Sequence, residues 1–233
     1  MRAFPHFRKF SAEQEDFVSR FKTGELTVDK GGAILVEGSH NAHLYTMLSG
    51  LAFRFKIIED GRRQILNYIF PGDLIGLQGS LTGEMQHSIE TLKPSVLCVF
   101  ERNRIDEIFV KHPKLAYDIT WLAAREERML DEHLLSIGRR TALERTAYVL
   151  SFLASRSIEA GMDQTGEVSL PVTQQHLADT LGLSIVHTNK TLKKLSDREL
   201  IKWGERSCTI NDVEALARIA NWQVGQTEDR PFI

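Results

Sequence analysis

Cysteine is scarce in this chain of 233 residues, which contains only Cys98 and Cys208. Two thiols so far apart exclude a disulfide framework and a multi-cysteine metal or iron–sulfur centre. We expect Cys208 to be a partly buried small residue rather than a redox sensor. No apolar run reaches the roughly 18 residues of a membrane span. The start of the chain also lacks the apolar centre and cleavage pattern of a signal peptide. We therefore expect a cytoplasmic protein with no membrane association.

The chain also has little excess charge of either sign. Lys and Arg total 29 against 31 Asp and Glu, and 42% of the residues are hydrophobic. These values are typical of globular proteins and exclude collagen, fibrous coiled coils and full disorder. They do not exclude nucleic-acid binding, because a basic face can be offset by acids elsewhere.

The N-terminal half is rich in turns. A helix is predicted over residues 11–21, followed to about residue 102 by glycine-containing turns at spacings typical of short antiparallel strands. Apolar residues alternate with other residues over 51–57, which predicts a half-buried strand. Asp60–Gly61 then predicts a hairpin turn, and 65–70 the returning strand. This region is therefore predicted to form a barrel or double sheet.

A long helix is predicted next, over residues 113–137, with a length of about 37 Å. Two stripes of residues run along it at heptad spacing. We assign the first to a parallel homodimer and the second to packing on the chain's own barrel; a helix buried within a monomer is the alternative. In the first stripe, Glu126 and His133 are expected to fix the register or act as a switch, or to lie in solvent. The first stripe is Leu115, Ile119, Leu122, Glu126, Met129 and His133, and the second is Ala116, Ala123, Leu130 and Leu134.

The C-terminal region has the pattern helix, glycine turn, helix. Thr173 is expected to cap a short helix that Gly182 ends, because glycine tolerates the left-handed conformation. A second helix is expected to start after Ser184. Two short strands around Gly204 then predict a wing, and a last helix is expected to extend to about Trp222.

The second of these helices is strongly cationic. It contains Lys190, Lys193 and Lys194 and no acid, a local charge of +3 in a chain of net charge −2. Such a helix, with free N–H groups at its N-terminus, suits phosphates. Three lysines alone often form only a solvated face. Together with the glycine turn and the wing, they favour binding to double-stranded DNA.

The order β-roll, long helix, hinge and winged helix-turn-helix resembles the cyclic-AMP receptor protein/FNR (Crp/Fnr) family of bacterial transcription regulators. The most specific segments are 60–66, 71–76 and 177–184. The resemblance implies an α+β fold that begins with an antiparallel β-roll similar to the cyclic-nucleotide-binding jelly roll. The implied boundaries are 1–112 for this sensor domain, 113–137 for the dimerisation helix, 138–140 for the hinge and 141–233 for the DNA-binding domain.

The resemblance also implies a homodimer on a two-fold symmetric operator, and contact with RNA polymerase if the protein is an activator. Lys190 is able to donate to guanine, and Asn189 to read adenine. Val186 stands where relatives commonly have glutamate and suits a thymine methyl group, so we expect a different target sequence. By position, the residues expected at the bases are Ile185, Val186, His187, Asn189 and Lys190, and those at the DNA backbone are Thr173, Gln174, Ser184 and Lys194.

We expect the signal that the sensor domain recognises to differ from cyclic AMP. The family binds the ribose with a Gly-Glu pair and the phosphate with an Arg-Ser/Thr pair, but here Leu77 and His87 replace the glutamate and the arginine. Leucine forms no hydrogen bond with a ribose, and histidine lacks the permanent charge of arginine. An unidentified effector is therefore expected in a pocket of another shape. Its candidate lining is Leu77, Gln78, His87, Ser88, Arg125 and Glu126.

No cofactor or metal is predicted, and the protein is not expected to be an enzyme. Haem is retained as a minor alternative on the histidines His6, His40, His43 and His87. A cupin-like metal-binding barrel enzyme is suggested by His40 and His43, but their spacing differs from that of cupins and residues 44–50 contain no acid. A sensor whose helix-turn-helix only binds protein is the third alternative, against which the lysine cluster argues.

Overall fold

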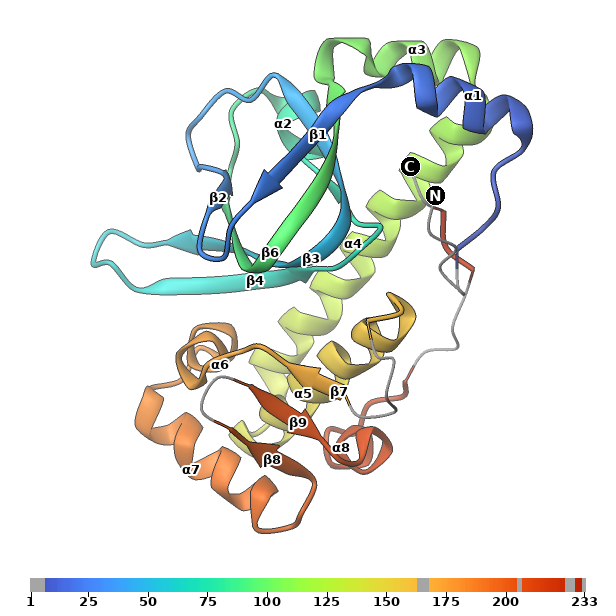
Figure 1. Cartoon of the computed structure of the whole chain (residues 1–233). Helices are drawn as coiled ribbons and strands as arrows, with labels where there is room; N and C mark the ends of the chain where they lie inside the picture. Colours follow the sequence, from blue (N-terminus) through green and yellow to red (C-terminus); the bar gives the residue numbers. More distant parts are fainter. Residues whose placement is uncertain (1–6, 163–167, 205–206, 225–228, 232–233) are drawn as a thin grey trace.

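The computed structural model describes residues 7–162, 168–204, 207–224 and 229–231, except for the side chains of residues 80–82. A sheet domain and a mainly helical domain are connected by α4 (Pro113–Arg139) (Figure 1). Among the described helices, none is long and apolar enough to cross a membrane. Parts of the predicted connector (163–167) and wing (205–206) lie outside the described residues, as does His6.

The sheet domain is an antiparallel roll. Its strands follow the order β1-β6-β3-β4, with β2 paired to β6 and β5 to β3. The predicted hairpin turn is present, with Gly61 at φ +85°. The predicted first helix is also confirmed, and the Ser11 and Gln14 side chains form its capping box. The elements are α1 (Ala12–Phe21), β1 (Lys22–Val28), β2 (Ala33–Leu35), β3 (His43–Ile57), β4 (Arg63–Ile69), β5 (Leu74–Ile75), α2 (Leu77–Thr82), β6 (Ser88–Glu101), a 3-10 turn (Arg102–Arg104) and α3 (Ile105–Lys111).

Strand β3 is more buried than its alternating sequence predicts. All four residues from Leu51 to Arg54 are buried, on both faces of the strand. Leu51 and Phe53 pack in the cluster shared with the C-terminal domain, and Ala52 lies in the interior of the roll. On the same face as Ala52, Arg54 Nη2 lies 3.0 Å from Glu126 Oε1 of α4. In contrast Ile57, which the alternation places on the buried face, is 54% exposed near the end of the hairpin.

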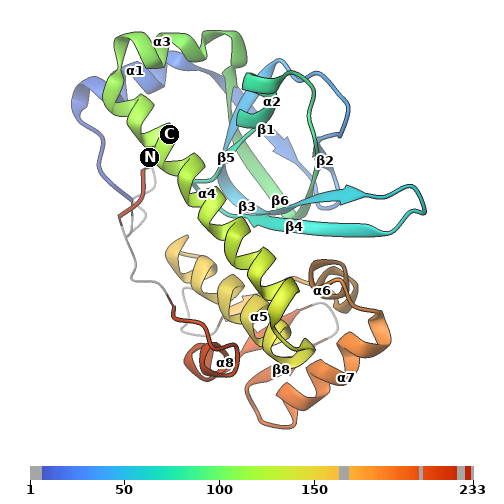
Figure 2. The ribbon, with the colours of Figure 1, turned by 180° about the vertical axis from the view of Figure 1, so that it is seen from behind.

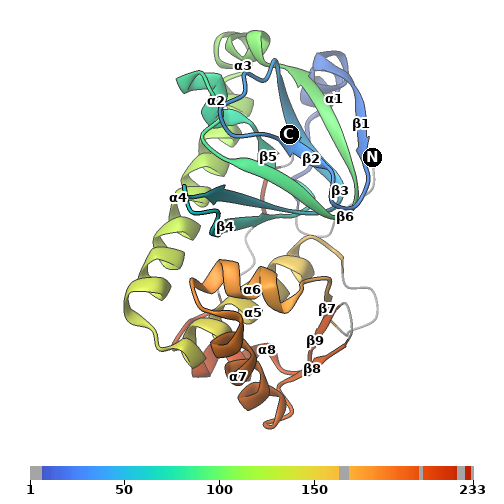
Figure 3. The ribbon, with the colours of Figure 1, turned by 90° about the vertical axis from the view of Figure 1, so that its left-hand side faces the viewer.

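The long helix extends two residues further than predicted. It ends at Arg139, so Gly138 lies inside the helix and the hinge is reduced to Arg140 before α5 (Ala142–Glu159) begins. Thr141 caps α5 through a capping box with Glu144. In Figure 2, α4 crosses in front of both domains, and in Figure 3 it runs along one side of the molecule.

The assignment of the two stripes on α4 is wrong, because the first stripe packs inside the chain. Leu115 and Ile119 are 0% and 3% exposed in the core of the sheet domain, and Leu122 packs against the same cluster. The other three members, Glu126, Met129 and His133, bond to or pack on the chain's own residues.

The second stripe faces outward over most of its length. Ala116 packs on the roll as expected, but Ala123 is exposed and Leu134 is 72% exposed. Ile137, at the next heptad position, is 39% exposed. The first stripe thus packs within the chain, whereas most of the second stripe is left uncovered in the single chain.

The C-terminal domain is a three-stranded sheet, β7-β9-β8, packed with four helices. The last helix is shorter than predicted and ends at Ile219; Trp222 lies beyond it, with its ring 5.4 Å from that of Tyr148. The elements after α5 are β7 (Val168–Leu170), α6 (Gln174–Leu181), α7 (Ile185–Ser196), β8 (Ile201–Trp203), β9 (Cys208–Ile210) and α8 (Val213–Ile219).

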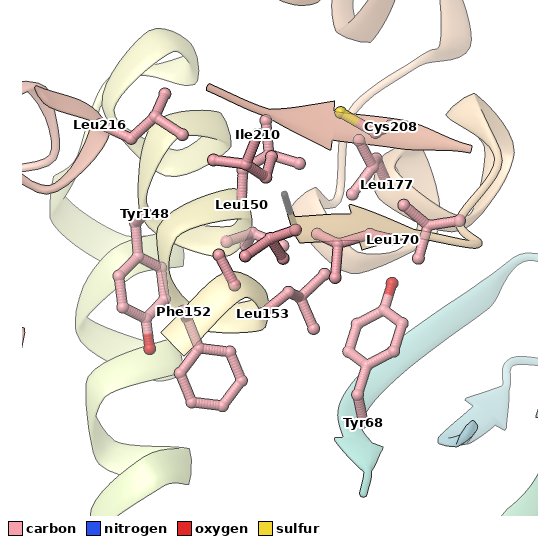
Figure 4. Close-up of a cluster of buried hydrophobic side chains, with 14 of the residues drawn as sticks. Tyr68, Tyr148, Leu150, Phe152, Leu153, Leu170, Leu177, Cys208, Ile210 and Leu216 are labelled. Carbon is pink, nitrogen blue, oxygen red and sulfur yellow. The ribbon is translucent and has the colours of Figure 1, made fainter. Parts of the chain in front are cut away.

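One hydrophobic cluster joins this domain to the sheet domain. It contains Leu150 and Leu177 from the C-terminal domain together with Phe53 and Tyr68 from the hairpin of the roll. Figure 4 shows Tyr68 reaching from β4 toward Leu170 and Leu177. The core is therefore continuous across the domain boundary.

Candidate nucleic-acid interface and sensor cavity

Local signals in the sequence build the helix-turn-helix. Thr173 Oγ1 accepts a hydrogen bond from the His176 N–H at 3.1 Å at the start of α6. Gly182 ends this helix at φ +63°, a conformation that favours glycine. Ser184 Oγ then accepts from the His187 N–H at 3.3 Å and starts α7. The three predicted capping residues are confirmed.

Helix α7 turns one face to the core and the other to solvent. Thr188, Thr191, Leu192 and Leu195 are buried. Ile185, which is expected at the bases, is 38% exposed. Val186 is 62% exposed, and α7 lies on the side of the C-terminal domain away from the roll (Figure 1). The other exposed residues of this face are His187, Asn189, Lys190, Lys193 and Lys194.

Three of the four predicted DNA-backbone residues lie at helix N-termini, and the fourth, Lys194, is on the exposed face itself. Thr173 and Ser184 are exposed at the N-termini of α6 and α7, and Gln174 is half-buried beside Thr173. The first-turn N–H groups of each helix lack a partner within the helix, and α7 also carries the exposed lysines. Such an arrangement suits the phosphates and base edges of duplex DNA.

A cavity of about 530 Å³ lies between the roll and α4. Five of the six predicted effector residues line it: Leu77, Gln78, His87, Arg125 and Glu126. Ser88 is not part of this lining, and its Oγ accepts a hydrogen bond from the Glu37 N–H at 3.0 Å. Five of the six residues named from the sequence therefore lie around one cavity, and Ser88 lies outside its lining.

The polar wall of this cavity is not predicted from the sequence. Arg54 and Asn67, from β3 and β4, both bond to Glu126 Oε1, at 3.0 and 3.1 Å. Burial and the neighbouring Arg54 lower the pKa of His87 to about 4, so this side chain is neutral near pH 7. The one indication of this wall in the sequence is Arg54, because a cation within an apolar strand needs a buried partner.

The charges in the cavity do not suit a phosphate. Its described lining contains two arginines, and both are already paired: Arg54 with Glu126, and Arg125 with Glu159. The lining also contains Asp73, Glu127 and Asp131. An anionic ligand has to compete with Glu126 and Glu159 for the two arginines.

The hairpin of the roll contacts the first helix of the helix-turn-helix. Arg63 Nε donates to Asp179 Oδ2 at 2.8 Å, and the Tyr68 and Thr180 hydroxyl groups lie 2.8 Å apart. The ring of His176 is 5.2 Å from that of Phe53. The sheet domain therefore contacts the helix-turn-helix directly, in addition to its connection through α4.

The described residues contain no cluster of three or more His, Cys, Asp or Glu side chains suited to a metal ion. His40 is exposed beside Glu84, and the ring of His43 lies 6.2 Å from that of Tyr45. Cys208 is fully buried, beyond the partial burial expected, and burial raises the pKa of its thiol to about 12. This environment disfavours the reactive thiolate form.

The fold and the cationic face of α7 define a DNA-binding transcription regulator. The Crp-like helix-turn-helix domain matches residues 144–219, and the cyclic nucleotide-binding domain matches residues 25–112. The chain belongs to the Crp/Fnr family.

Its relatives include the nitrogen fixation regulation proteins FixK of Bradyrhizobium diazoefficiens and Rhizobium meliloti. The first is 30% identical, over 80% of this chain and 79% of that protein, and the second 31% identical, over 84% and 86%. The solved structure of FixK2 from Bradyrhizobium japonicum is similar at a TM-score of 0.73 with 24% identity, over 84% of this chain and 96% of that one.

Proposed function

We propose that the protein binds a two-fold symmetric operator as a homodimer and places one α7 helix in each of two successive major grooves. The exposed face of α7 carries this proposal, because it combines lysines for phosphates with Asn189 and Lys190 for base edges. Val186, 62% exposed on the same face, suits a thymine methyl group. Contact with RNA polymerase is part of the proposal if the protein is an activator.

The second stripe of α4 is the proposed dimer surface. Ala123, Leu130, Leu134 and Ile137 recur at heptad spacing, and Leu134 is 72% exposed in the single chain. Packing against the same stripe of a second copy would remove this apolar surface from water and form a parallel coiled coil. A second copy of α4 is also the occupant that gives the two-fold symmetry a palindromic operator requires.

The proposed effector occupies the cavity between the roll and α4. We expect it to lack a phosphate, because Leu77 and His87 offer neither a ribose acceptor nor a permanent cation, and Arg54 and Arg125 are paired. Any such ligand changes the arrangement of the two domains only by its differential affinity for the alternative arrangements.

Selection of bound DNA from a random pool tests the function. We expect a palindromic motif and salt-dependent binding in gel-shift titrations. Lys190→Ala is expected to weaken binding to the selected motif by about 1–3 kcal/mol and to relax its sequence preference. Lys114→Ala, which removes the same charge from an exposed site at the start of α4, is the control and should bind normally.

Two outcomes would contradict the proposal. Recovery of no DNA at low salt would favour a helix-turn-helix that binds only protein. Equal affinities of wild type and Lys190→Ala at fixed salt would mean that α7 does not enter the groove in the proposed pose.

A further inference from the structure

A buried ionic cluster lies where the sheet domain, α5 and the C-terminal segment meet. Asp73, in the turn after β4, is at its centre. Arg156 Nη2 donates to the two Asp73 carboxylate oxygens at 2.8 and 2.7 Å, and Arg230 Nη2 donates to Oδ1 at 2.7 Å. The arginine side chains are only 3% and 2% exposed. Three segments that are distant in sequence thus share one carboxylate.

An aromatic ring lies beside each guanidinium group, and a backbone hydrogen bond holds the segment that carries Arg230. Arg156 lies over the ring of Phe70 at 5.2 Å, and Arg230 over that of Phe7 at 4.9 Å. The Arg8 N–H donates to the Arg230 carbonyl at 2.8 Å. Gly72, at φ +86°, permits this approach, because a Cβ atom there would lie 2.3 Å from the Phe7 ring and 3.1 Å from Arg230 Nη2.

Asp73 is the group on which the cluster depends. Although burial opposes its ionisation, Arg156 and Arg230 hold the pKa of the Asp73 carboxyl well below its usual range. In both arginines, the buried Nε and Nη1 atoms have no hydrogen-bond partner among the described residues, and Arg156 Nη1 has only a longer ion pair, at 3.6 Å, with Glu159 Oε2. Loss of the Asp73 charge would therefore leave two buried guanidinium groups without the carboxylate that their Nη2 atoms bind.

The cluster is placed to control the direction of α5. Arg140, the hinge, precedes this helix, whereas Arg156 is in its last turn. The distance along the helix from Ala142 to Arg156 is about 21 Å at 1.5 Å per residue. A shift of about 1 Å at this end would turn α5 by about 3°. Helices α6 and α7 share a core with α5 and would turn with it.

We infer that Asp73, Arg156 and Arg230 form a clamp that fixes the DNA-binding domain against the sheet domain, in the arrangement that leaves α7 facing away from the roll. Asp73 and Arg230 are thus positioning residues for operator binding, an inference that rests on the proposed function. Asp73 also lines the sensor cavity, so a ligand there is in reach of the clamp.

Arg230→Gln in the full chain tests the clamp by operator affinity. Opening it reduces the fraction of molecules in the binding arrangement, and the apparent Kd rises by the inverse of that fraction. We expect about tenfold weaker binding, with much of it restored in Arg230→Lys, which keeps the charge and a donor. The salt dependence should keep its slope, because no phosphate contact is lost. Arg20→Gln, which removes an exposed arginine on α1, is the matched control.

The double variant Asp73→Asn/Arg230→Gln tests whether Asp73 and Arg230 affect operator affinity through their contact with each other. It should bind DNA within about twofold of Asp73→Asn alone, because both changes open the same clamp. Additive losses would contradict a shared role. A reduced salt slope in Arg230→Gln would show that Arg230 contacts DNA directly, which would overturn the positioning role.

Amide hydrogen exchange without DNA provides a readout that is independent of the operator. We expect faster exchange in the last turns of α5 in Arg230→Gln than in Arg20→Gln, with both variants folded by circular dichroism. If this difference appears but the wild type binds no DNA, the clamp stands and the proposed function fails. Unchanged exchange together with unchanged affinity would overturn the clamp.

Discussion

The clearest test of the junction between the two domains is the substitution His133→Gln. His133 Nδ1 lies 2.7 Å from the Tyr148 hydroxyl, and Nε2 lies 3.4 Å from Asn67 Oδ1. Its ring packs edge-on against Phe152, at 4.8 Å between centroids. Burial, with a contribution from Arg54, lowers the pKa of His133 from 6.5 to about 4. Helix α4, the hairpin and α5 therefore meet at a neutral imidazole.

The depressed pKa fixes the sign and size of the effect. Between about pH 4 and pH 6.5 the unfolded chain binds a proton at His133 that the folded protein does not, so stability is lost as the pH falls through this window. At pH 5.5, one unit below the ordinary histidine pKa of about 6.5, the ratio of charged to neutral imidazole in the unfolded chain is about ten. The resulting loss, relative to pH 7.5, is about 1.3 kcal/mol at 1.36 kcal/mol per pKa unit.

Urea titrations followed by circular dichroism at pH 7.5 and 5.5 measure this contribution. The free energy of unfolding of the wild type should fall by about 1.3 kcal/mol more between these pH values than that of His133→Gln. His187→Gln, at an exposed position on α7, should behave as the wild type does. Equal pH dependence in the wild type and His133→Gln would refute a buried neutral imidazole at this junction.

Three further predictions follow from the fold. Leu134→Glu should convert the proposed dimer to monomers in sedimentation velocity, whereas Phe109→Glu, on α3, should leave it intact; a dimeric Leu134→Glu protein would refute the proposed surface. Gly182→Ala should lower the free energy of unfolding in urea by about 1–2 kcal/mol through the left-handed backbone alone, because the nearest atom to an added Cβ is at 3.7 Å. Calorimetry with cyclic AMP should show no binding at micromolar concentrations, and a saturable micromolar signal would contradict our interpretation of Leu77 and His87.

The helix-turn-helix could be predicted from sequence because each of its signals is local. Thr173, Gly182 and Ser184 act on backbone groups within a few residues, so their chemistry is visible in a short window. The heptad stripes of α4 were equally visible. Which stripe meets the roll depends on how the sheet domain closes, and Leu115 and Leu134 look alike in a helical pattern.

The contacts between the domains had no comparable signal. Arg63 bonds to Asp179, 116 positions away, and Arg230 bonds to Asp73, 157 positions away. The sequence does not distinguish a surface arginine from a buried one. The partner of a buried arginine is known only once the fold brings distant segments together. The polar wall around Glu126 was missed for the same reason, since Arg54 and Asn67 come from different strands.

The shared hydrophobic core limits how far this regulator can be taken apart. A fragment starting at Thr141 would lose the cover that Phe53 and Tyr68 provide, and would expose the side of α5 and α6 that they protect. The C-terminal domain therefore depends on the roll for part of its core, and we expect it to pack incompletely when it is attached to another sensor domain. A chimera with another sensor would first have to reproduce the packing of Phe53 and Tyr68 on the C-terminal domain.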